Sequence, residues 1–153
     1  MNNENVSFTN QSERIGKLIL QLQRLERNPR IFGDAGTLTP SEIHTVDAIG
    51  LAGAVRMGQL AERLGITKGA VTQLIDRLEG KELVLRTSHP VDSRAVLISL
   101  TKKGKLAFQA HESMHQQFFQ KLSKELDNKE IAIFEKGLQI FTEVLTDHHS
   151  QVD

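Results

Sequence analysis

The stretch MGQLAERLGITKGAVTQLIDRLEGKELV, residues 57–84, restricts the fold of this chain more than any other feature. Two short segments with helical periodicity flank Gly65, and glycine tolerates the left-handed backbone of a tight turn between helices. Ala61 is small enough for the second helix to pack closely against the first. The spacing therefore predicts a helix-turn-helix, with helices from about Met57 to Leu64 and from about Thr67 to Glu82. The second helix has an apolar face made of Ala70, Val71, Leu74, Ile75 and Leu78.

The opposite face of the second predicted helix is polar. Its side chains are of the types that bond to base edges and phosphates in the major groove of DNA. A glycine in this face permits close approach of the backbone, although it is equally compatible with a minor helix defect. An ordinary helical hairpin is the alternative interpretation of the whole motif. The candidate DNA-binding residues are Thr67, Lys68, Gly69, Thr72, Gln73 and Arg77.

Two β-rich runs, VLRTS and AVLISL, follow the second helix, with the turn-forming segment HPVDS between them. They predict a two-stranded hairpin, which in this position is a wing whose tip can reach a minor groove. We expect Arg94 to enter that groove. Asp92 could hold Arg94 or Arg86 by a charge-assisted hydrogen bond, or it could serve the turn alone. Arg86 is expected to contact phosphate or to remain solvated.

Charge is distributed unevenly along the chain. The 153 residues contain 19 basic and 19 acidic side chains, so the formal net charge is zero. The segment 56–105 holds ten basic and five acidic residues, a net charge of +5, and the remainder carries −5. A positive segment that coincides with the helix-turn-helix is compatible with a nucleic-acid partner, although a solvated basic face would look the same.

The flanking regions are predicted to be helical. Apolar spacing indicates a first helix over 12–27, and Thr39 with Glu42 forms a capping box before a second helix that ends near Gly50. Long helices are expected on both sides of Asp127. The last one carries two apolar stripes, which a small domain cannot bury alone, so we expect it to pair with another chain. The stripes comprise Phe134, Leu138, Phe141 and Leu145, and Ile133, Ile140 and Val144.

Several classes of protein are disfavoured by composition. The chain has no cysteine, so disulfides and thiol chemistry are excluded, and any metal site must use His, Asp or Glu. No apolar run is long enough for a membrane span. The polar start MNNENVSFTN does not look like a secretory signal, which indicates a cytoplasmic protein. The sequence contains no G-x-S-x-G, H-E-x-x-H or glycine-rich phosphate loop, so we do not expect an enzyme.

These features together resemble the MarR family of winged-helix transcription regulators. The resemblance rests on LTPSEIHTVDAI, on the helix-turn-helix stretch, and on DSRAVLISLTKKG, which matches the D-x-R and LT-x-x-G wing signature of the family. It implies a mainly α fold with a small β-wing, formed as one domain over 1–153. The winged-helix lobe would span 39–101, and 12–27 and 104–148 would be dimerisation helices.

The resemblance also implies a function. A homodimeric repressor would bind a pseudo-palindromic operator in double-stranded DNA under the control of a small effector. The absence of cysteine rules out the thiol-based peroxide sensing found in the family. A sequence-neutral architectural protein is the alternative, and it would show a small ratio of specific to non-specific affinity.

Histidines suggest what the effector is. His111 and His115 are one helical turn apart, and His44 lies on a helix that in this family faces them. Imidazoles with a carboxylate suit tetrahedral Zn²⁺. The pattern resembles zinc-responsive family members and suggests a site made of Glu26, His44, His111 and His115. The alternative is that these histidines line an organic-ligand pocket or pack as neutral core residues.

Overall fold

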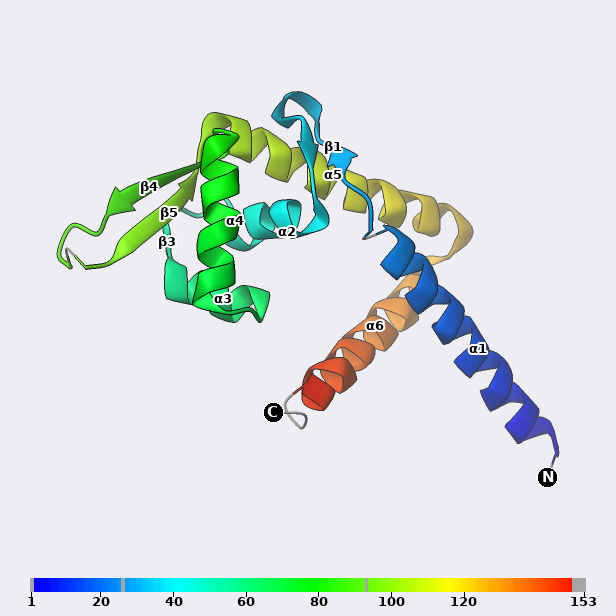
Figure 1. Ribbon diagram of the computed structural model, residues 1–153. Helices are drawn as coiled ribbons and strands as arrows, with labels where there is room; N and C mark the ends of the chain where they lie inside the picture. The colour runs from blue at the N-terminus through cyan, green and yellow to red at the C-terminus, as the bar shows by residue number, and fades with distance from the viewer. Residues whose placement is uncertain (1, 26, 93, 150–153) are drawn as a thin grey trace. The chain divides into compact units, whose positions relative to one another are not determined.

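The computed structural model describes residues 2–25, 27–92 and 94–149 (Figure 1). The chain forms two compact units, residues 1–111 and residues 112–153. The first unit contains the elements expected of a winged helix, and the second contains the end of one long helix and the whole of the last. The helices are α1 (Asn2–Leu25), α2 (Pro40–Ile49), α3 (Met57–Leu64), α4 (Lys68–Gly80), α5 (Lys102–Glu125) and α6 (Asn128–His149). The strands are β1 (Arg30–Ile31), β2 (Thr37–Leu38), β3 (Val55–Arg56), β4 (Val84–Ser88) and β5 (Val96–Leu100), with a 3-10 turn at Gly33–Ala35.

Capping residues explain where the helices of the first unit begin. Thr39 accepts a hydrogen bond from the backbone of Glu42, and the Glu42 carboxylate accepts one from the backbone of Thr39, which is the predicted capping box. Thr67 caps α4 in the same way through the backbone N–H of Ala70. Between α3 and α4, Gly65 adopts φ 63° and ψ 33°, the left-handed conformation that the turn was predicted to need.

The core of the first unit lies where α2, α3, α4 and the start of α5 meet the sheet. Leu60, Ile75 and Leu78 are completely buried, and they come from both helices of the helix-turn-helix. Ala61 is also buried, consistent with close packing of the second helix against the first. Ala107 extends this core into α5. The apolar face of α4 therefore orients the opposite, polar face of this helix towards solvent.

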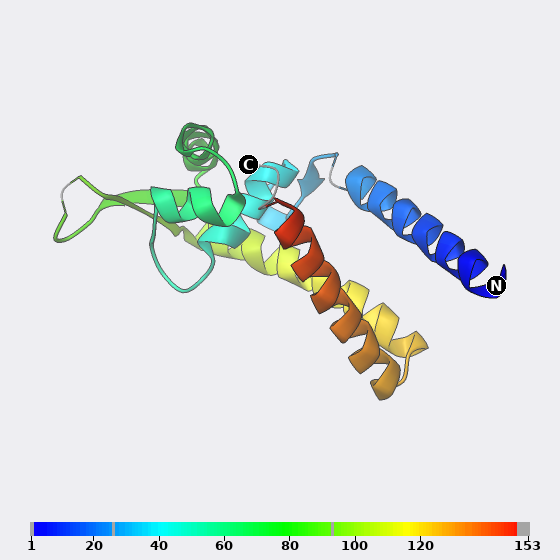
Figure 2. The same cartoon turned by 90° about the horizontal axis from the view of Figure 1, so that it is seen from below.

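The wing is a three-stranded antiparallel sheet in the order β3-β5-β4. Val84 pairs with Leu100 and Ser88 with Val96, so the two long strands are in register from the core to the tip. Figure 2 shows the hairpin extending away from the helices of its unit. Alternation along the strands buries Val84 and Ile98 and leaves Leu85 exposed. The sheet thus anchors one end of the wing in the core.

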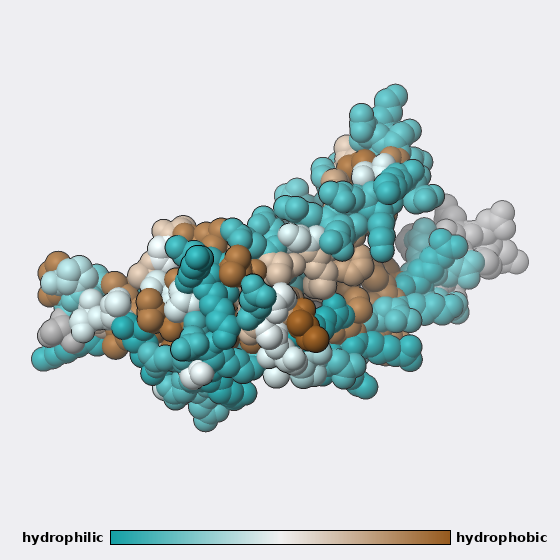
Figure 3. Space-filling model, turned by 90° about the horizontal axis from the view of Figure 1, so that it is seen from above, coloured by the Kyte–Doolittle hydropathy of each residue, from teal (hydrophilic) through white to brown (hydrophobic). Residues whose placement is uncertain are grey.

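Two helices carry rows of exposed apolar side chains. In α1 these are Ile15, Leu18, Ile19, Leu22 and Leu25, and in α6 they are Ile133, Phe134, Leu138, Ile140, Val144 and Leu145. The face drawn in Figure 3 is mostly hydrophilic, with hydrophobic atoms in separate patches. No helix in the described part of the chain has the length and hydrophobicity needed to cross a membrane.

The predicted mainly α fold with a small β-wing is confirmed. Differences are local. The first helix begins at Asn2 rather than near Ser12, because apolar periodicity marks a packing face and not the residue where hydrogen bonding begins. Helix α4 ends at Gly80 rather than at Glu82, which has a positive φ of 62°. The short strands β1, β2 and β3 were not expected, since two residues are too few to show alternation.

Candidate nucleic-acid interface

The polar face of α4 is the centre of the candidate interface. Val71, Leu74, Ile75 and Leu78 are buried, and the positions between them are exposed. Thr72, Gln73 and Arg77 are among the exposed side chains, as are Lys68 and Gly69 at the start of the helix. A Cβ built on Gly69 would come no nearer than 4.0 Å to its closest neighbour, Thr67 Oγ1. Packing within the protein therefore does not require glycine at this position.

Hydrogen bonds hold the start of α4 in place. Thr67 Oγ1 accepts from Ala70 N at 3.2 Å, and the hydroxyl of Thr72 donates to the carbonyl of Lys68 at 3.0 Å. These bonds leave the amide of Gln73 and the guanidinium of Arg77 on the exposed face, where either could reach a base edge. The first turn of the helix is the part of a recognition helix that usually enters the major groove.

Arg86 joins the wing to the recognition helix. From β4 its guanidinium donates to Asp76 Oδ1 at 2.5 Å and to Glu79 Oε2 at 2.8 Å, and both carboxylates belong to α4. The predicted roles of Arg86 were phosphate contact or solvation, and the structure adds an intramolecular one. Since its side chain is 31% exposed, the ion pairs are partly screened by water, and we attribute to them orientation rather than much stability.

Arg94 lies exposed at the far side of the wing tip. The carboxylate of Asp92 accepts a hydrogen bond from the backbone N–H of Arg94 at 3.1 Å. The structure thus places Asp92 and Arg94 together at the tip and shows Arg86 in contact with α4 instead. The backbone of the tip is closed by His89 N donating to Ala95 O and by Ala95 N donating to Asp92 O.

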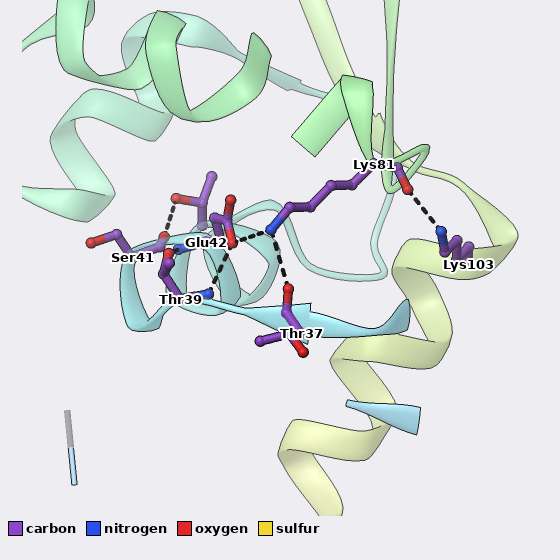
Figure 4. A network of polar contacts seen from close by, with 7 residues as sticks. Thr37, Thr39, Ser41, Glu42, Lys81 and Lys103 are labelled. Carbon is purple, nitrogen blue, oxygen red and sulfur yellow. Dashed lines mark hydrogen bonds and ion pairs between the residues drawn. The ribbon is translucent and has the colours of Figure 1, made fainter. Parts of the chain in front are cut away.

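A partly buried ion pair supports the other end of α4. Lys81 reaches from the end of the helix to the carboxylate of Glu42, at 2.7 Å, and to the carbonyl of Thr37, at 3.2 Å (Figure 4). Lys103 donates to the carbonyl of Lys81 and links this network to α5. Burial is the largest single influence on the pKa of Glu42 and would raise it. Hydrogen bonds from Lys81 and Thr39, with the positive charge of Lys81, outweigh burial and lower that pKa.

Of the four residues predicted to bind metal, two are described in the same compact unit of the structure. His44 and His111, both in the first unit, have ring centroids 5.9 Å apart. His111 is 4% exposed, its Nδ1 lies 2.6 Å from Asp47 Oδ2, and its ring meets the edge of Phe32. His115 belongs to the second unit and Glu26 lies outside the described residues. Among the residues that the structure describes, no group of three His, Asp or Glu side chains is close enough to hold an ion.

Three sets of side-chain contacts were not predicted from the sequence. These are the pairing of Arg86 with Asp76 and Glu79, the link between Lys81 and Glu42, and the contacts of the His89 ring in the wing tip. Each joins side chains whose relation depends on a packed helix or a turn geometry. For Arg86, the only sequence signal was a basic residue that follows the acidic residues Asp76 and Glu79. Many surface charges show the same spacing without forming an ion pair.

The fold and the exposed polar helix define a winged helix-turn-helix protein of the DNA-binding class. A family model described as the MarR family matches residues 38–96. The multiple antibiotic resistance protein MarR of Salmonella typhimurium is 30% identical over 123 residues, which cover 79% of this chain and 85% of that protein. The chain belongs to the MarR family of transcription regulators, and the alternative of an enzyme is therefore set aside.

Two solved structures are also similar. Streptococcus pneumoniae FabT in complex with DNA is 29% identical with a TM-score of 0.78, and the match covers 92% of this chain and 98% of FabT. Lactococcus lactis ZitR, a zinc-responsive MarR family member, is 26% identical with a TM-score of 0.65, over 90% of this chain and 99% of ZitR. A shorter match, 33% identical over 72 residues, covers 47% of this chain and 46% of the transcriptional repressor MdtR of Bacillus subtilis.

Proposed function

We propose that this chain is a homodimeric repressor that binds a pseudo-palindromic operator in double-stranded DNA. The observation that carries the proposal is the two-sided character of α4, with Leu74, Ile75 and Leu78 buried and Thr72, Gln73 and Arg77 exposed. The wing beside it presents a second cation, Arg94. The DNA complex of FabT and the repressor MdtR support the assignment. A repressor of this kind needs access to DNA, and we propose on this ground that the protein is cytoplasmic.

Direct reading of bases distinguishes a regulator from an architectural DNA-binding protein. Gln73 carries an amide that can bond bidentately to adenine, so Gln73→Ala should relax sequence preference. Arg94→Ala should weaken binding to all sequences and reduce the slope of log affinity against log salt by about one. Lys136→Ala, an exposed lysine of α6, is the matched control and should change neither quantity.

The experiment begins with a duplex enriched by the wild-type protein from a random-sequence library. Titrations at several salt concentrations then compare this duplex with a scrambled one for each variant. A specific duplex bound at least about a thousandfold more tightly than the scrambled one supports a regulator. A ratio near one would show an architectural protein. Unchanged affinity in both Gln73→Ala and Arg94→Ala would show that α4 and the wing do not form the interface.

The dimer is proposed from the exposed apolar faces of α1 and α6. Ile133 is 72% exposed and Ile140 is 51% exposed in the single chain, which is unusual for large aliphatic side chains. A second copy would cover such rows with matching rows, because a two-fold axis brings identical surfaces together. Two recognition helices would then be available for the two halves of a palindrome.

For the effector we propose a divalent metal such as Zn²⁺, held in part by His44 and His111. The support is the Asp47 carboxylate on Nδ1 of His111, because a metal-binding imidazole commonly donates its second ring N–H to a carboxylate. In this proposal Nε2 of His111 would bind the ion, because Nδ1 contacts Asp47. His115, one turn further along α5, and Glu26 remain the proposed additional ligands. A bound ion would join the ligand-bearing segments and so bias the spacing of the recognition helices.

Calorimetric titration of metal-stripped, untagged protein with Zn²⁺ tests this effector. His111→Ala should abolish tight binding, and Asp47→Asn should weaken it about 10- to 100-fold, because it removes the charge behind the ligand. His89→Asn, which removes a histidine of the wing, is the control and should bind as the wild type does. Equal zinc affinity in all four proteins, with operator binding unaffected by chelator, would favour an organic ligand or a structural role for these histidines.

A further inference from the structure

His89 stands where β4 ends and the wing tip begins. Its Nδ1 lies 3.1 Å from the backbone nitrogen of Asp92 and 3.3 Å from that of Val91. Both nitrogens are donors, so Nδ1 accepts two hydrogen bonds and holds both amides of the turn. On the other edge of the ring, Nε2 lies 3.2 Å from Nη2 of Arg56. Arg56 comes from β3, which pairs with β5 and not with β4.

The ring of His89 therefore has hydrogen-bond donors beside both of its nitrogens. A guanidinium only donates and keeps its charge at every physiological pH. A neutral imidazole has one acceptor nitrogen, and the two backbone amides favour Nδ1 for this role. Nε2 then carries the hydrogen and faces Arg56 without accepting a hydrogen bond from it. An imidazolium has no acceptor nitrogen, since both nitrogens carry hydrogen. Protonation of His89 would set donors against the amides of Val91 and Asp92 and place a cation 3.2 Å from Arg56.

The same turn positions Arg94. The backbone N–H of Asp92 donates to His89, and the Asp92 carboxylate accepts from the backbone N–H of Arg94. The carbonyl of Asp92 accepts from Ala95, whose own carbonyl accepts from the backbone of His89. Asp92 thus links the two sides of the tip. Its N–H bonds to the His89 ring, and its carbonyl and carboxylate bond to the backbones of Ala95 and Arg94. Loss of the His89 bonds would release the backbone that fixes the direction of Arg94.

We propose that His89 is a positioning residue for DNA binding, and that its neutral ring holds the wing tip in the conformation that presents Arg94. The inference rests on the proposed function, in which Arg94 enters a minor groove. The charged groups around the ring are the Arg56 guanidinium and the Asp92 carboxylate. This carboxylate already accepts from Arg94, and the contact of Asp92 with the ring is through its N–H.

The sign of the pH effect separates this role from simple charge. Histidine is the side chain that gains a proton between about pH 8 and pH 5.5. A new positive charge near DNA would by itself strengthen binding on acidification. If the ring positions the tip, acidification weakens operator binding instead, because protonation removes the acceptor.

His89→Asn is the informative variant. The Oδ1 of asparagine sits two bonds from Cβ, as Nδ1 does, so it can accept from Val91 and Asp92, and it does not titrate. His89→Ala removes the acceptor altogether. Operator affinity is measured with the duplex enriched by the wild-type protein, between about pH 8 and pH 5.5 at constant ionic strength. Other titrating groups are common to all three proteins, so ratios between them isolate position 89.

We expect His89→Asn to bind like the wild type at pH 8 and about tenfold more tightly than the wild type at the acid end, because protonation removes both hydrogen bonds that the ring accepts. His89→Ala should bind weakly at both extremes. The proposal would be overturned if the operator affinities of the wild type and His89→Asn changed in parallel with pH. It would also be overturned if the wild type gained affinity in acid relative to His89→Asn.

A second measurement does not depend on DNA binding. Amide proton resonances of Val91 and Asp92, followed by NMR in the free protein, should shift with the titration of the ring in the wild type and not in His89→Asn. Absence of that difference overturns the hydrogen bonds on which the proposal stands. If these resonances titrate as expected but the protein binds no duplex at pH 8, the contact to the turn stands, and it is the proposed function that fails.

Discussion

Replacing Lys81 by methionine tests how the base of the recognition helix is held. The substitution keeps an unbranched side chain of similar length and removes the ammonium 2.7 Å from the carboxylate of Glu42. That carboxylate is 3% exposed, so without Lys81 it keeps its bond from the Thr39 backbone but loses its counter-ion. Breaking a fully buried pair costs about 3–5 kcal/mol, and a charge-assisted hydrogen bond contributes about 1.5–3 kcal/mol.

The expected loss lies near the lower of these ranges. The Lys81 side chain is 38% exposed, so solvent already screens part of the attraction, and water can replace some of the lost contact. We expect the free energy of unfolding to fall by about 2 kcal/mol, which for a chain of this size lowers Tm by about 4–8 °C. Protein concentration must be constant, since the stability of a dimer depends on it. Lys121→Met, at an exposed position of α5, is the matched control.

The pH dependence gives the same pair a second signature. The pKa of Glu42 is lowered in the folded protein from its ordinary value of 4.5. A lowered folded pKa means that the stabilisation is complete above the ordinary value and is lost as the pH falls through the folded value. The difference in stability between wild type and Glu42→Gln should therefore shrink on acidification below pH 4.5. Urea titrations of both proteins and of Lys81→Met measure this. A Lys81→Met protein within about 0.5 kcal/mol of the wild type would refute the reasoning.

Three further predictions concern packing, capping and assembly. A Cβ at Gly104 would lie 2.0 Å from the carbonyl oxygen of Leu83, so Gly104→Ala should cost at least about 1–3 kcal/mol in thermal unfolding. Gly137→Ala in α6 is the control, because no atom lies within 4 Å of the new Cβ, and it should be neutral or stabilising. A similar loss of stability in Gly104→Ala and Gly137→Ala would contradict the packing argument. Thr67→Ala removes the cap of α4 and should destabilise by about 1 kcal/mol in urea, whereas no change would mean that water replaces the cap. Charged residues in place of Phe134 and Leu138 should yield monomer or unfolded chain by sedimentation, and a folded wild-type monomer would disprove the dimer.

Much of the lobe followed from the sequence because the signals are local. The Thr39 and Glu42 capping box, the turn at Gly65 and the apolar face of α4 each depend on residues within about one or two helical turns of each other. Helical periodicity then decided which side chains of α4 are exposed, and the structure agrees for Gln73 and its neighbours. The hairpin was predicted for the same reason, since two β-rich runs and the turn segment between them are close together in the sequence.

Tertiary structure alone decided which charges and rings meet. Glu42 looked like a local capping residue, yet its counter-ion, Lys81, lies 39 residues away. Arg86 was assigned to phosphate or solvent, and the packing of β4 beside α4 gave it Asp76 and Glu79 as partners. The His89 ring bonds to the nearby amides of Val91 and Asp92, and packing of another strand adds Arg56 beside its second nitrogen. Hydrogen bonds act over about 3 Å, whereas sequence patterns report only periodicity, so such contacts become visible once the chain is folded.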